Sequence, residues 1–144
     1  MRPSRPCSAP SGQRNLNGTK RLRAAHGEKY HFVLVYVVDP HPKVDVSVYR
    51  GAPWTFEYSK YRQATTLAQR ATFANSVSTE GAFDEVLVDE LQPSNNATTA
   101  HNNPTWCGWG PCPNCAWLID RNGTVKLSQV WFEEEAMGEA MRAG

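Results

Sequence analysis

The sequence has almost no net charge. Its 144 residues include 15 lysines and arginines against 14 aspartates and glutamates, so the formal net charge at pH 7 is +1. A chain balanced in this way lacks the strongly basic surface that gives a protein affinity for nucleic acid. We therefore expect no nucleic-acid partner. The basic stretch before Glu28 is rich in proline, serine and glycine, which favours a solvated leader over a binding arm.

Long apolar runs are also missing. No stretch approaches the roughly 20 apolar residues that a membrane-spanning helix needs. No apolar segment follows the basic residues at the start, as a secretory signal would require. We therefore expect no membrane association and a cytoplasmic location. The four cysteines of such a chain are more typical of reduced, catalytic or metal-binding thiols than of structural disulfides.

The chain has the length of one domain. We expect Met1–Gly12 to be an irregular basic leader and residues 13–144 to form the domain. Inside it, helical and strand-like apolar patterns alternate, which predicts an α/β fold with parallel strands first and an antiparallel hairpin near the end. The expected helices are Asn15–His26, Gln63–Val77, Ser94–His101 and Glu133–Arg142, and the expected strands are His31–Val38, Glu85–Leu91, Ala116–Ile119 and Thr124–Trp131.

Three cysteines stand just before that hairpin. Cys107, Cys112 and Cys115 have the spacing C-x4-C-x2-C, and Cys115 directly precedes the strand Ala116–Ile119. The dipeptide Asn122-Gly123 between the two strands is a strong signal for a two-residue hairpin loop. Two thiols separated by two residues suit either disulfide exchange or metal ligation. The spacing alone does not choose between them.

The segment FVLVYVVDPHP, Phe32–Pro42, resembles the iodothyronine deiodinases and their bacterial deiodinase-like and redoxin-domain relatives in the thioredoxin-like superfamily. Tyr58–Thr66 (YSKYRQATT) and Leu87–Ala97 (LVDELQPSNNA) extend the similarity. The resemblance implies a thioredoxin-like sandwich with a mixed sheet that ends in a β-hairpin and a C-terminal helix. It also implies reductive thiol or selenol chemistry on a small-molecule or protein thiol substrate. We expect no cofactor and no metal for that chemistry.

The start of the chain departs from the family pattern. There, a full β-strand precedes the nucleophile, and Pro-Pro-Phe follows it. Cys7 is at the matching distance from Phe32, but Ser8-Ala9-Pro10 follows it and only six residues precede it. We therefore expect an N-terminally abbreviated fold. The missing strand would leave an open sheet edge that a second copy of the chain could cover, by a homodimer or a domain swap.

The candidate catalytic residues are Cys112, Cys115, Cys7 and His41. In thioredoxin-like folds the loop before the third strand faces the N-terminus of the first helix, so the resemblance places Cys112 and Cys115 opposite Cys7. Arg14 or Lys20 would then favour the thiolate. His41 matches the histidine of the family's turn and is a candidate general acid or thiol partner, the alternative being an idle turn residue.

Other interpretations of the cysteine loop stay open. The thiols can be inert and buried, or Cys107, Cys112 and Cys115 can bind zinc together with His101. The corresponding function is a non-catalytic binding module on the same fold. Trp109 beside these cysteines can line a substrate cleft or fill the core, and Asp89 can serve the thiols or make structural hydrogen bonds.

Overall fold

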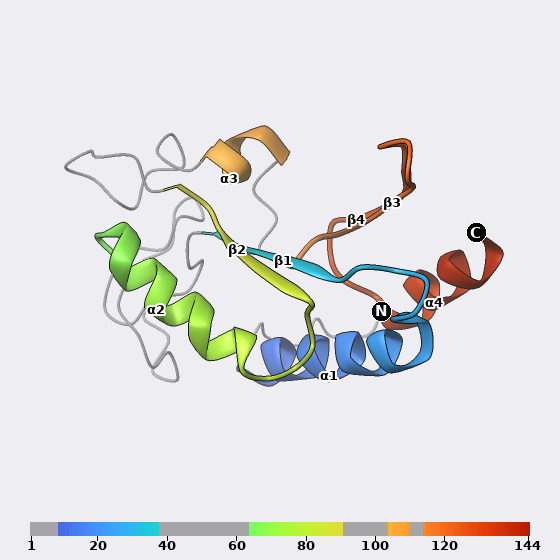
Figure 1. Cartoon of the computed structure of the whole chain (residues 1–144), viewed down its shortest axis with the longest axis horizontal. Helices are drawn as coiled ribbons and strands as arrows, with labels where there is room; N and C mark the ends of the chain where they lie inside the picture. The colour runs from blue at the N-terminus through green and yellow to red at the C-terminus, as the bar shows by residue number, and fades with distance from the viewer. Residues whose placement is uncertain (1–8, 38–63, 91–103, 110–113) are drawn as a thin grey trace, which may run out of the picture.

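The computed structural model describes residues 9–37, 64–90, 104–109 and 114–144. These residues form a mixed α/β structure with small sheets (Figure 1). None of its helices is long and apolar enough to cross a membrane. The helices are α1 (Ala9–His26), α2 (Leu67–Ser78), α3 (Pro104–Trp109) and α4 (Glu134–Ala143), and the strands are β1 (Val33–Tyr36), β2 (Glu85–Val88), β3 (Ala116–Ile119) and β4 (Val125–Gln129).

β1 and β2 form a parallel pair, in register from Val33 opposite Glu85 to Tyr36 opposite Val88. The run of β-branched and apolar residues in each strand favours this pairing. α2 lies between them in the chain and packs against β2. Thr66 caps α2, because its side chain accepts a hydrogen bond from the backbone N–H of Gln69 at 3.2 Å. This unit confirms the expected parallel strands.

β3 and β4 form the expected antiparallel hairpin, but its loop is longer than the sequence suggested. Asp120 N–H donates to the carbonyl of Thr124 at 2.9 Å, so three residues lie in the loop rather than Asn122-Gly123 alone. Gly123 takes the left-handed conformation, with φ +81°, at the position where three-residue loops need it. The Asp120 carboxylate accepts hydrogen bonds from the N–H groups of Asn122 and Thr124, each at 2.9 Å, and these bonds select the longer loop.

The hydrophobic core lies between α1, α4 and the hairpin. α1 and α4 approach closely because glycines face the contact: a Cβ at Gly18 would lie 3.0 Å from Phe132 Cε1, and one at Gly138 would lie 3.2 Å from Leu22 Cδ2. α4 also contacts both strands of the hairpin. The buried members of this core are Leu22, Phe32, Leu118, Met137 and Met141.

The four strands do not join into the expected mixed sheet within the described part of the chain. They form two separate two-stranded sheets, β1–β2 and β3–β4. Residues 9–12, expected to belong to an irregular leader, are helical in α1. The thioredoxin-like assignment and the homodimer therefore stay predictions.

Two helix boundaries correct the sequence analysis. α1 begins at Ala9 instead of Asn15, and Pro10 lies in its first turn. α3 begins at Pro104, in a segment where no helix was expected. Both differences have one cause, because the first turn of a helix does not need the N–H group that proline lacks. The expected helix Ser94–His101 falls outside the described residues.

Substitution of Leu118 and of Ile119 tests which face of β3 packs against the core. Leu118 is 8% exposed and Ile119 is 43% exposed. We expect Leu118→Ala to lower the free energy of unfolding by about 2–5 kcal/mol, because it leaves a cavity beside α4. The neighbouring control Ile119→Ala should cost less than about 1 kcal/mol. Chemical denaturation measures both, and equal losses would contradict this assignment of the two faces.

Candidate functional site

Cys115 is the predicted catalytic residue that the structure describes. Cys7, His41 and Cys112 lie outside the described residues, as do His101 and the side chain of Cys107. The predicted approach of Cys7 to the other thiols and the predicted zinc set are therefore not placed by the structure. Among the residues that are placed, no group of three or more His, Cys, Asp and Glu side chains could hold a metal ion.

Cys115 carries a half-buried thiol immediately before β3. The backbone on its N-terminal side is fixed from the far end of the hairpin. The N–H of Phe132 donates to the carbonyl of Asn114 at 2.7 Å, and Asn114 forms a parallel bridge with Trp131. The backbone just before Cys115 is therefore fixed by the segment that follows β4, in addition to the pairing of β3 with β4.

A second contact ties this strand entry to α1. Asn15 Nδ2 donates to Asn114 Oδ1 at 3.2 Å, across 99 residues of sequence. Asn15 belongs to the N-terminal half of α1, so Asn114 lies against that half of the helix. Asn114, the neighbour of Cys115, is thus fixed twice: its backbone by the segment after β4 and its side chain by α1.

Lys20, one of the two cations expected near the thiols, forms an ion pair with Glu80. Its ammonium is 2.8 Å from Glu80 Oε2, beyond the end of α2. Five residues of α-helix rotate a side chain by about 140°, so Lys20 leaves α1 in a different direction from Asn15. The influence of Lys20 on the thiols stays a prediction.

An aromatic pair lies on the thiol side of β3. Trp109 at the end of α3 packs edge-on against Trp117, with ring centroids 5.0 Å apart and planes at 66°. Trp109 is 51% exposed, which excludes the alternative that it fills the core. Cys115 and Trp117 are two residues apart at the start of an extended strand, so their side chains lie on the same face. The pair offers apolar surface beside the thiol.

Asp89 makes structural hydrogen bonds, in line with one of the two interpretations of the sequence. It is 3% exposed, and its Oδ1 accepts from the N–H of Thr105 at 2.9 Å. Its backbone carbonyl accepts from Arg70 Nη1 at 3.0 Å. Sequence analysis missed the buried Arg70. The available signal was its position one turn before Ala74 on the face of α2 that packs inward.

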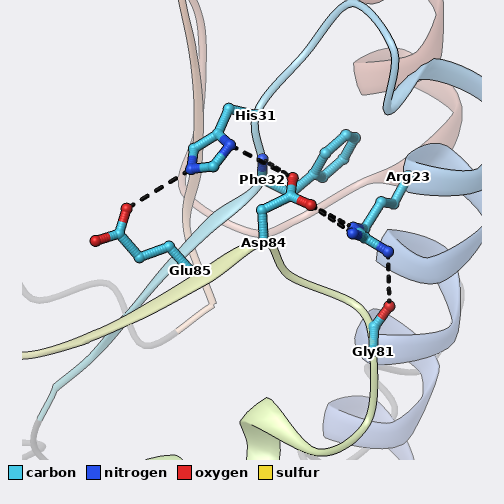
Figure 2. Close-up of polar contacts among 6 residues, drawn as sticks. All are labelled: Arg23, His31, Phe32, Gly81, Asp84 and Glu85. Atoms are coloured by element: carbon cyan, nitrogen blue, oxygen red, sulfur yellow. Dashed lines mark hydrogen bonds and ion pairs between the residues drawn. The ribbon is translucent and has the colours of Figure 1, made fainter.

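The carboxylate of Asp84 lies at the amino ends of β1 and β2 and accepts hydrogen bonds there (Figure 2). Asp84 Oδ2 accepts from the N–H of Phe32 at 2.8 Å, and Oδ1 accepts from Arg23 Nε at 2.9 Å and from Arg23 Nη2. Hydrogen bonding by Arg23, followed by the Phe32 N–H, holds the pKa of the Asp84 carboxyl below its usual range. Arg23 also donates to the carbonyl of Gly81 at 3.4 Å.

His31 lies at the edge of this cluster. Its Nδ1 is 3.7 Å from Asp84 Oδ2, and its Nε2 is 3.6 Å from Glu85 Oε2 (Figure 2). The His31 side chain is 65% exposed, so water screens both contacts. The cluster therefore has a structural role, in which it joins α1 to the first residues of β1 and β2.

Comparisons with protein-family models, with curated proteins and with solved structures gave no match.

The lowered pKa of Asp84 makes a prediction about acid stability. A carboxyl with a lowered folded-state pKa stabilises the fold above its unfolded-state pKa of about 3.9, and this contribution is lost as the pH falls through the folded-state value. Asp84→Asn should therefore be less stable than the wild type above about pH 5, and the difference should shrink in acid. Denaturant unfolding between neutral pH and pH 3 measures this.

Glu85→Gln is the matched control, because it removes the neighbouring carboxyl, which contacts His31 and not Arg23. It should keep the acid-dependent loss of the wild type. A difference between wild type and Asp84→Asn that stays constant with pH would contradict the assignment.

Proposed function

We propose that this chain is a thiol-dependent oxidoreductase or redox-responsive protein of deiodinase-like, thioredoxin-like type, with Cys115 and Cys112 as its reacting pair. The observation that carries the proposal is the placement of Cys115. Its thiol is half-buried at the entry to β3, next to Asn114, whose backbone carbonyl accepts from the N–H of Phe132 and whose side chain accepts from Asn15 of α1. Such placement gives a thiol a fixed approach direction while leaving part of it accessible.

The spacing of the two cysteines supports their pairing. In Cys112-Pro113-Asn114-Cys115 the proline stands at the second position of four, where β-turns favour it. The end residues of a β-turn have Cα atoms within about 7 Å. That separation is within the reach of a disulfide bond. The sequence therefore predicts that the two sulfurs can meet without a change in the strand entry.

The reaction that we propose is thiol–disulfide exchange. One of the two thiolates attacks a disulfide of the substrate, which forms a mixed disulfide and releases one substrate thiolate. The other cysteine thiolate then attacks the mixed disulfide, which forms the Cys112–Cys115 bond and releases the second substrate thiolate. The cysteine pair loses two electrons and the substrate disulfide gains two. The aromatic surface of Trp109 and Trp117 is available to bind an apolar part of the substrate beside the thiol.

The test is a redox titration in which the alkylation of each cysteine is followed by mass spectrometry. On mild oxidation the wild type should form a Cys112–Cys115 disulfide and protect both residues together. Cys112→Ser and Cys115→Ser should each abolish that joint protection. Cys107→Ser is the matched control in the same loop and should keep it, because Cys107 is not a member of the C-x2-C pair.

Two results would overturn the proposal. Slow and independent alkylation of all four thiols, without a Cys112–Cys115 disulfide, would identify a chain with no redox activity at this loop. Stoichiometric zinc in the purified protein, released when the thiols are modified, would favour the non-catalytic zinc-stabilised binding module instead.

A further inference from the structure

Arg70 is a buried cation with hydrogen-bonding capacity left over. Its exposed fraction is 0%, and it is the largest fully buried side chain of the described residues. Nη1 donates to the carbonyl of Asp89 at 3.0 Å. Within the described ranges, Nε and Nη2 have no hydrogen-bond partner. One edge of the guanidinium is thus satisfied and another is open.

Buried guanidinium donors without acceptors lower the stability of the folded state. A guanidinium stays charged and has only donors, so every buried N–H needs an acceptor. Burial lowers the pKa of Arg70, opposed by the nearby Asp89 and Tyr36. The carboxylate of Asp89 offsets part of the charge. It does not supply acceptors to Nε and Nη2, and each unsatisfied buried donor costs about 1–3 kcal/mol or more when charged.

The two nitrogens without an acceptor in the described part of the chain are the pair that binds an oxyanion by two parallel hydrogen bonds. Nε and Nη2 lie on one edge of the planar guanidinium and match the two oxygens of a carboxylate or phosphate. The chain itself shows this pairing at an exposed site. Arg21 Nε donates to Glu134 Oε1 at 2.7 Å, and Arg21 Nη2 donates to Glu134 Oε2. At Arg70 the same edge is available inside the protein.

The position of Arg70 also favours ligand binding. Its partner Asp89 follows β2 directly, and the N–H of Asp89 donates to the carbonyl of Tyr36, the last residue of β1, at 2.9 Å. Arg70 therefore reaches the carboxyl ends of two parallel strands, the edge where open α/β sheets bind ligands. The amino ends of the same strands are closed by Asp84.

We propose that the Nε–Nη2 edge of Arg70 binds a free small-molecule oxyanion of the carboxylate or phosphate class at the carboxyl ends of β1 and β2. The oxyanion supplies two acceptor oxygens to the open edge. This site is separate from Cys115 and does not depend on the proposed thiol reaction. An oxyanion-bearing substrate or effector of this chain would be recognised here.

Thermal unfolding in the presence of inorganic phosphate, and separately of acetate, tests the site against sodium chloride at equal ionic strength. The wild type should be stabilised by at least one of the two oxyanions beyond the effect of chloride, because the ligand binds the folded state. In Arg70→Lys the affinity should fall by about tenfold or more, since lysine keeps the charge and loses the two-point geometry.

Arg21→Lys is the matched control, because the same edge of Arg21 already holds Glu134 and its side chain is 62% exposed. It should keep the response of the wild type. A second measurement on the wild type covers the case in which Arg70→Lys does not fold. The side-chain Nε–H resonance of Arg70, assigned through its own carbons, should shift during the oxyanion titration and stay unchanged with chloride.

Three outcomes would overturn the site. The oxyanions could stabilise the wild type no more than chloride does. Arg70→Lys and Arg21→Lys could lose the stabilisation by oxyanions equally. The Nε–H resonance of Arg70 could stay unchanged with both oxyanions. The last result would mean that neither oxyanion binds at the open edge.

Discussion

The carboxylate of Asp84 is the contact on which the arrangement of the first half of the chain depends. It accepts hydrogen bonds from Arg23 in α1 and from the N–H of Phe32 just before β1, while it stands itself just before β2. One side chain thus fixes a helix and two strands relative to each other. A two-stranded sheet is marginal on its own, so β1 and β2 need this anchor as well as the packing of α2.

α1 joins the two sheets in place of a shared strand. On one side it reaches the β1–β2 unit through the ion pairs of Lys20 with Glu80 and of Arg23 with Asp84. On the other it reaches the hairpin unit through Asn15, which donates to Asn114, and through its packing against α4. Figure 1 shows α1 running along both units. The strand entry that carries Cys115 is therefore positioned by the same helix that anchors the parallel pair.

Local patterns predicted the elements of this fold, and non-local contacts explain what they missed. β3 was predicted residue for residue, since a short apolar run and a nearby turn define it within a few positions. The division of the described strands into two sheets is a matter of non-local pairing, which these local patterns do not encode. At the thiol site, the sequence indicated Cys115 by the spacing of its cysteines. The burial of Arg70, at the other candidate site, was not predicted, because an arginine is ordinarily solvated. Only the tertiary packing of α2 shows that it is buried.

The parallel register of β1 and β2 has a consequence for the order of folding. The hairpin pairs residues a few positions apart, which closes on the timescale of microseconds. Val33 pairs with Glu85, so the parallel pair must first close a long loop, and its anchors to α1 span 60 and 61 residues. Such non-local pairing slows folding. When the complete chain folds, the hairpin should therefore form early and the β1–β2 unit late, which leaves the edges of β1 and β2 open to other chains in the interval.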